Sequence, residues 1–69
     1  MHIGQRIKEI MAERRVSVIW VSKQIGCERT NVYNIFEREG INTELLQKFC
    51  LILDHDFFKE LSKDTFKRK

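Results

Sequence analysis

Apolar and polar residues recur at the spacing of an α-helix along most of this 69-residue chain. Near its start, Ile3, Ile7, Ile10 and Met11 fall at i, i+4, i+7 and i+8, which is one stripe of a helix. The sequence contains no proline, and no strand-forming run bounded by turn residues interrupts this pattern. The periodicity therefore predicts an all-α fold with five helices and no strand, over residues 2–13, 17–25, 28–36, 43–53 and 57–62.

Residues 17–36, SVIWVSKQIGCERTNVYNIF, carry the most informative pattern. Gly26 separates two short amphipathic helices and permits the positive φ of a tight turn. Ser22, four residues earlier, is small enough to let the second helix approach the first. Val32 and Ile35, six and nine residues after the glycine, hold the second helix against the rest. This spacing predicts two helices packed at a steep angle.

The pattern resembles the helix-turn-helix (HTH) of the Cro/lambda-repressor (XRE-type) family over roughly residues 3–62. The resemblance implies a compact four- to five-helix, lambda-repressor-like DNA-binding domain over residues 1–62, with the HTH motif at 17–36. It implies a small, repressor-like transcriptional regulator whose helix 28–36 enters the major groove of double-stranded DNA. It also implies a homodimer on two-fold related half-sites. Residues 63–69, KDTFKRK, are expected to form a basic, frayed tail.

Polar residues of helix 28–36 share one expected solvent face: Arg29, Thr30, Tyr33 and Asn34 fall at i, i+1, i+4 and i+5. These are the positions at which the resembling repressors place their base readers. Arg29 has the donors for guanine, Asn34 pairs with the adenine edge, and Thr30 suits a thymine methyl or a phosphate. Tyr33 is expected on a phosphate or sugar. The alternative is an ordinary solvated helix face.

Four further residues are expected to contact the DNA backbone: Lys23, Arg38, Asn42 and Thr43. Asn42 and Thr43 begin a helix, whose free amides suit an anion. Glu28 stands at the cap of the reading helix, where its charge repels a phosphate unless it accepts from a cytosine amine.

An apolar run, Val18, Ile19 and Trp20, does not fit one buried stripe of a helix. Either another segment covers part of it, such as Phe66 of the tail, or a second chain does, or Trp20 lies flat on its own domain. An alternative function follows: a protein-interaction module on the same fold, with little DNA affinity, that uses this run and the Phe57–Phe58 pair as contact anchors.

The net charge, the cysteines and the motifs of the sequence limit the classes of function that remain. The net charge is +3, and residues 59–69 carry all of it, so the rest of the chain is neutral overall. Cys27 and Cys50 lack metal-ligand spacing and are expected to be free, buried thiols. No catalytic set, cofactor motif, small-molecule site, signal peptide or membrane span stands out. We therefore expect a cytoplasmic protein that is not an enzyme and binds no metal or cofactor.

Overall fold

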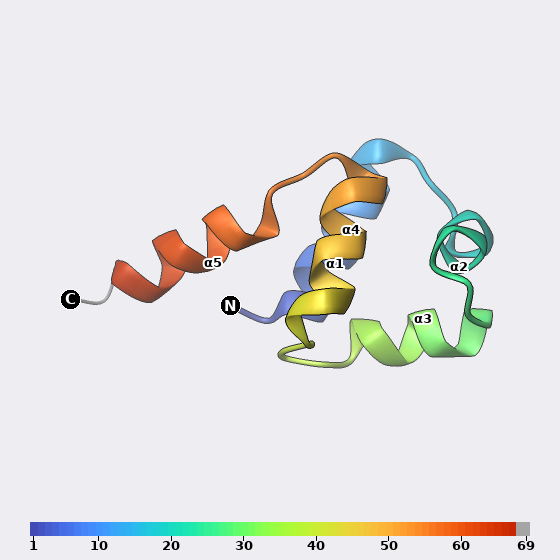
Figure 1. Ribbon diagram of the computed structural model, residues 1–69, viewed down its shortest axis with the longest axis horizontal. Coiled ribbons are helices and arrows are strands. Elements are labelled where there is room, and N and C mark those ends of the chain that lie inside the picture. Colours follow the sequence, from blue (N-terminus) through green and yellow to red (C-terminus); the bar gives the residue numbers. More distant parts are fainter. Residues whose placement is uncertain (68–69) are drawn as a thin grey trace.

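A computed structural model describes residues 1–67. The described part contains five helices and no strand, which confirms the all-α prediction. The helices are α1 (Ile3–Arg14), α2 (Val18–Ile25), α3 (Arg29–Phe36), α4 (Thr43–Leu53) and α5 (Phe57–Phe66) (Figure 1). The first four lie within one residue of their predicted bounds, whereas α5 is four residues longer than predicted.

Side-chain caps fix where four of these helices begin, and at α1 the His2 Nδ1 accepts from the Gln5 N–H at 3.2 Å. The side chains of Ser17, Asn42 and Asp56 each accept a hydrogen bond from the backbone N–H three residues later, at 3.0, 2.7 and 3.0 Å. Each bond satisfies one of the amides that the first turn of a helix leaves without a partner. Short polar side chains such as these are the ones that favour the position before a helix. Glu28, at the corresponding position before α3, makes no such bond.

The core lies where α1, α2, α3 and α4 meet, and α5 contributes its first residue. Its buried apolar residues are Ile3, Ile7, Ile10, Met11, Val21, Val32, Ile35, Phe36, Leu46, Phe49, Leu53 and Phe57. The predicted stripe of α1 is thus buried completely. Cys27 and Cys50 are free, as predicted, but half-buried at the edge of this core, so their predicted full burial is wrong.

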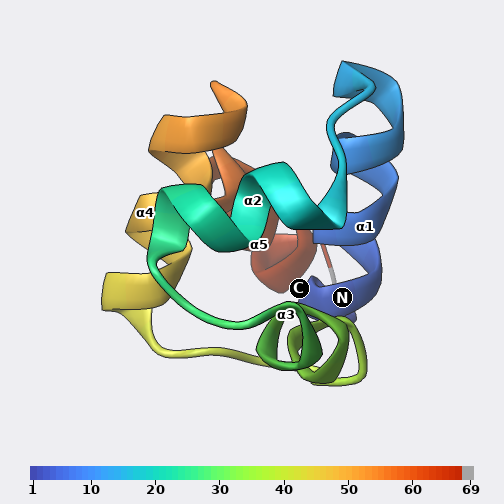
Figure 2. The same ribbon diagram turned by 90° about the vertical axis from the view of Figure 1, so that its right-hand side faces the viewer.

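The two helices of residues 17–36 cross steeply, as their spacing predicted. Figure 1 looks along α2 and across α3, and Figure 2, turned by 90°, looks along α3 and across α2. Gly26 has φ 83° and donates its N–H to the Ser22 carbonyl at 2.8 Å, which ends α2. Ser22 is buried, and its hydroxyl donates to the Ile19 carbonyl at 2.7 Å. A small, hydrogen-bonded side chain at this position allows the close approach of α3.

The start of α1 is joined to the end of α3 by backbone hydrogen bonds. Ile3 N–H donates to the Glu39 carbonyl and Gly4 N–H to the Arg38 carbonyl, both at 2.9 Å. A Cβ atom on Gly4 would lie 2.3 Å from the Ile35 carbonyl oxygen. Only glycine therefore lets these two helix ends meet at this distance. No pattern in the sequence indicated this contact.

Residues 63–66 are helical, so the prediction that the chain frays from residue 63 is wrong for them; residues 68 and 69 lie outside the described part. The basic composition of this segment suggested a tail, but Lys63 lies in the last turn of α5, where a cation favours the helix dipole. The Lys67 N–H continues the hydrogen-bond pattern to the Lys63 carbonyl at 3.0 Å. The helix extends away from the other four (Figure 1).

Of the predicted partner contacts, the structure excludes Phe57 because it is buried in the core. Phe58 is partly exposed, as are Ile19 and Trp20 of α2, while Val18 packs against the core. Phe66, which was considered as a cover for Trp20, lies at the end of α5, and Figure 1 places α5 and α2 at opposite ends of the molecule. Trp20 keeps 39% of its surface exposed.

Candidate nucleic-acid interface

One face of α3 is polar and exposed while the other is buried. Arg29, Thr30, Tyr33 and Asn34 are all exposed, as their spacing predicted. The opposite side is held by Val32, Ile35 and Phe36. The rings of Tyr33 and Phe36 pack in a T-shaped arrangement, with 6.0 Å between ring centroids and an interplanar angle of 86°. The core therefore fixes the helix from behind and presents its polar face outward.

At the N-terminal end of α3, the turn brings α2 against the polar face. A shallow hollow there is lined in part by Lys23 of α2 and by Glu28, Arg29 and Thr30. Lys23, predicted to contact the DNA backbone, thus lies beside two predicted base readers. Because Glu28 makes no side-chain cap bond, its carboxylate adds an anion to this hollow. The hollow also includes Ile19, which gives it one apolar wall.

The other predicted backbone contacts lie beyond the opposite end of α3. Arg38, Asn42 and Thr43 are exposed in or just after the connection from α3 to α4 (Figure 1). The backbone carbonyl of Arg38 is used by Gly4, but its guanidinium faces solvent. The side-chain oxygen of Asn42 is engaged in capping α4, so its amide nitrogen is the group left for an anion. The predicted contacts therefore flank α3 at both ends.

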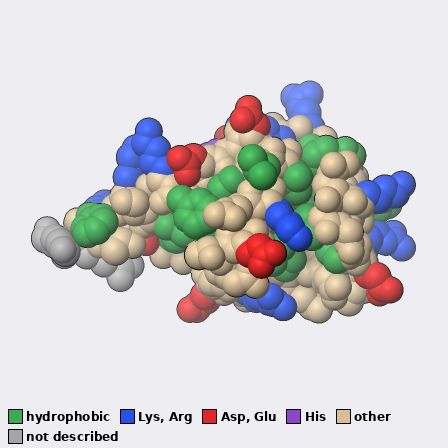
Figure 3. All heavy atoms as spheres, in the orientation of Figure 1, with side chains coloured by type: hydrophobic (Ala, Val, Ile, Leu, Met, Phe, Trp, Pro, Cys, Tyr) green, Lys and Arg blue, Asp and Glu red, His purple; other side chains and the backbone are tan. Residues whose placement is uncertain are grey.

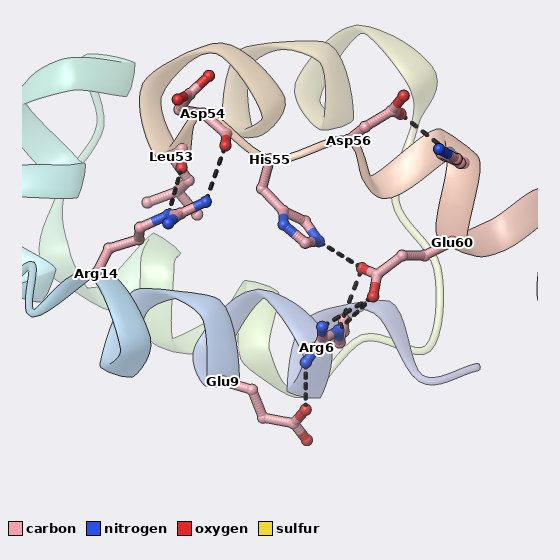
Figure 4. Close-up of polar contacts among 9 residues, drawn as sticks. Arg6, Glu9, Arg14, Leu53, Asp54, His55, Asp56 and Glu60 are labelled. Carbon is pink, nitrogen blue, oxygen red and sulfur yellow. Dashed lines mark hydrogen bonds and ion pairs between the residues drawn. The ribbon is translucent and has the colours of Figure 1, made fainter.

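Sequence reasoning missed an ionic cluster that joins α1 to α5 (Figure 4). The Arg6 guanidinium donates to both carboxylate oxygens of Glu60, with contacts of 2.8–3.1 Å, and to Glu9 at 2.9 Å. His55 Nε2 lies 2.7 Å from Glu60. Only the Arg6–Glu9 pair, three residues apart on one helix, was visible in the sequence. The link from Arg6 to Glu60 spans 54 residues and depends on tertiary packing.

The cluster shifts the ionisation of both of its main members. Hydrogen bonds to Glu60 and then to Glu9 raise the pKa of Arg6 above its ordinary value. Burial by itself would raise the pKa of Glu60, but hydrogen bonds from Arg6 and His55 more than offset this and leave that pKa below its ordinary 4.5. Both groups are therefore charged at neutral pH. The cluster anchors α5 and lies away from the polar face of α3.

Within residues 1–67, no group of His, Cys, Asp or Glu is arranged to hold a metal ion. None of the described helices is long and apolar enough to cross a membrane.

The comparisons with known proteins point to one family. The family model for the Cro/C1-type HTH DNA-binding domain matches residues 6–67, which is most of the chain. Searches of curated proteins and of solved structures gave no match. The steep α2–α3 pair with its exposed polar helix agrees with the family match, and the chain belongs to the Cro/C1-type HTH DNA-binding family.

Proposed function

We propose that this chain is a small transcription regulator that binds specific double-stranded DNA as a homodimer, with α3 in the major groove. One observation carries the proposal. Arg29, Thr30 and Asn34 form an exposed polar face on a helix whose other face is fixed in the core. A major-groove reader needs donors and acceptors held rigidly in this way.

Each polar side chain has a proposed task. Arg29 donates two hydrogen bonds to guanine, Asn34 pairs with the edge of adenine, and Thr30 contacts a thymine methyl or a phosphate. Tyr33 and Lys23 contact the DNA backbone near the N-terminal part of α3. At its other end, the exposed side chains of Arg38, Asn42 and Thr43 meet a second stretch of phosphates.

The charge distribution predicts specific rather than general affinity. Residues 1–58 are neutral overall, so each chain neutralises few phosphates. Affinity for random duplex DNA should therefore be weak and should depend little on salt. The base contacts of α3 then supply much of the binding free energy at physiological salt.

A selection from random duplexes, followed by salt-dependent titration, tests the proposal. Arg29→Ala should remove a contact worth roughly 1–3 kcal/mol and relax the preference at one base pair. Lys23→Ala should weaken all sequences alike and reduce the salt slope by about one. Lys59→Ala removes the same charge from the exposed surface of α5 and serves as the control, with no effect on the selected motif.

A protein-contact role remains the second candidate, and the exposure of Ile19 and Trp20 favours it. The two roles predict different outcomes of the selection. If no sequence is enriched, or if Arg29→Ala leaves the motif unchanged, α3 is not the reading helix. The protein-contact role would then be the better account, and it predicts that Trp20→Ala abolishes binding of a partner protein.

A further inference from the structure

Beyond its first residue, α5 contacts the rest of the molecule along a narrow stripe. Phe57 is buried in the core, but no later residue of α5 within the described part is fully buried. Glu60, Leu61 and Asp64 are half-buried and share one side of the helix. Asp64 contacts the amino group of Met1 at 2.8 Å. Figure 3 shows this end of the molecule as a narrow extension. The stripe therefore consists of one apolar side chain and two carboxylates.

Glu60 makes the most extensive polar contacts of this stripe. Its carboxylate accepts from the Arg6 guanidinium at 2.8–3.1 Å and lies 2.7 Å from His55 Nε2. Arg6 comes from α1, where it also pairs with Glu9 at 2.9 Å, and His55 comes from the connection between α4 and α5. The side chains of Glu60 and Arg6 are only 25% and 28% exposed. Protonation of Glu60 would remove the negative charge on which these bonds depend, so this carboxylate holds α5 only as an anion.

Without the stripe, α5 has little support for its helical structure. It is 10 residues long, and isolated helices shorter than about 12–15 residues are marginal in water. The other four helices have their own buried core, to which α5 contributes only Phe57 among its fully buried residues. Loss of the contacts made by Glu60 can therefore remain local, with the segment after Phe57 losing its helix while α1 to α4 stay folded.

We propose that Glu60, with Arg6 and His55, forms an acid-sensitive latch: protonation of Glu60 frees residues 58–67 from α1 while Phe57 and the four-helix core stay in place. The order of α5 then responds to acid, and the polar face of α3 does not change. The latch contains no residue of α3 and its test contains no DNA. It can therefore fail while the proposed function holds, and the reverse is also true.

The direction of the pH dependence follows from the contacts of Glu60. Its pKa in the folded chain lies below its ordinary 4.5, since hydrogen bonds from Arg6 and His55 outweigh the effect of burial. The docked state of α5 is therefore fully favoured above that pH and is lost as the pH falls through the folded-state value. Two other carboxylates need controls: Asp56 caps the first turn of α5 at 3.0 Å, and Asp64 contacts Met1.

Nuclear magnetic resonance of the full chain, titrated from about pH 7 to about pH 3, tests the latch residue by residue. In wild type, the amides of residues 59–67 should lose their helical chemical shifts below about pH 4.5, while those of α1 and α4 keep theirs. Glu60→Gln should lack this acid step. Asp56→Asn should retain it, because asparagine caps a helix without a charge. Asp64→Asn should retain it as well.

Hydrogen exchange at about pH 7 ties the effect to the Arg6–Glu60 pair. Glu60→Gln and Arg6→Gln should each speed exchange of the amides of residues 61–66 by roughly tenfold, since each removes a charged hydrogen-bonded pair. The double variant should exchange little faster than either single variant, because both changes remove the same interaction. Glu13→Gln, on the exposed surface of α1, is the matched control and should leave this exchange unaltered.

Three results overturn the proposal. The first is a single acid transition in which α5 and the other four helices lose their native shifts together. The second is an α5 that stays helical at the lowest pH of the titration while the core is also intact. The third is an acid step that persists in Glu60→Gln, or that disappears instead in Asp56→Asn or Asp64→Asn, which would assign the response to a different carboxylate.

Discussion

Replacing Gly4 with alanine should destabilise the protein, although alanine is the better helix former. A Cβ at this position would lie 2.3, 2.5 and 2.7 Å from the carbonyl oxygens of Ile35, Phe36 and Arg38. All three are backbone atoms near the C-terminal end of α3, so no side-chain rotation relieves the overlap. The ends of α1 and α3 must separate, which breaks the two 2.9 Å hydrogen bonds that join them.

The cost follows from these contacts. Overpacking costs about 1–3 kcal/mol, and each lost hydrogen bond adds about 1 kcal/mol. The higher helix propensity of alanine returns at most about 1 kcal/mol. The net loss is therefore roughly 2–4 kcal/mol, a large part of the roughly 3–10 kcal/mol expected for a domain of this size. The melting temperature should fall by roughly 10–30 °C.

Thermal and urea unfolding, followed by circular dichroism, measure this loss. Gly40→Ala is the matched control because a Cβ at Gly40 meets nothing within 4 Å and its φ is not positive. It should leave stability unchanged or raise it by up to about 1 kcal/mol. If Gly4→Ala melts at or above the wild-type temperature, the contact between α1 and α3 does not restrict this position and the reasoning is refuted.

Two further predictions concern α5 and α2. Because the pKa of Glu60 is lower in the folded chain than its ordinary 4.5, its stabilising effect is complete above that pH and is lost as the pH falls through the folded-state pKa. Glu60→Gln should therefore flatten the dependence of unfolding free energy on pH below about 4.5. Glu13→Gln, which removes an exposed carboxylate of α1, should not. If wild type and Glu60→Gln show the same slope of unfolding free energy against pH, the prediction is contradicted. Trp20 is 39% exposed, so its fluorescence emission maximum should lie between that of free tryptophan and that of a buried indole. An emission maximum equal to that of free tryptophan would show that nothing covers the side chain.

Features that depend on neighbouring residues were predictable from the sequence. The stripe of α1 follows from periodicity alone, and the caps at Ser17, Asn42 and Asp56 follow from the reach of short polar side chains to the next turn. The turn at Gly26 has a comparable local signal. Such features depend on local interactions and not on how distant parts of the chain pack.

Features set by tertiary packing were not predictable. Periodicity could not decide which of the adjacent aromatics Phe57 and Phe58 is buried, because that depends on how α5 leaves the end of α4. The special role of Gly4 appears only when α3 is placed against α1. The Arg6–Glu60 pair, which holds α5 in place, joins residues 54 positions apart. The length of α5 was missed for the same reason, since composition alone suggested a tail.

The candidate site also has features that the sequence predicted and features that it did not. The spacing of residues 29–34 predicted the exposed face of α3, and the structure confirms that exposure. Their contacts with bases remain a prediction, because no property of an exposed side chain identifies its ligand.

The placement of charge separates two surfaces of this small chain. The polar face of α3 carries a single cation, Arg29, and the nearby Lys23 shares its hollow with Glu28. The cations of α5, by contrast, lie on a helix that extends away from α3 (Figure 1). Because few cations lie beside the polar face of α3, non-specific attraction to phosphates there should be weak, and specificity should depend on the base contacts proposed for Arg29 and Asn34.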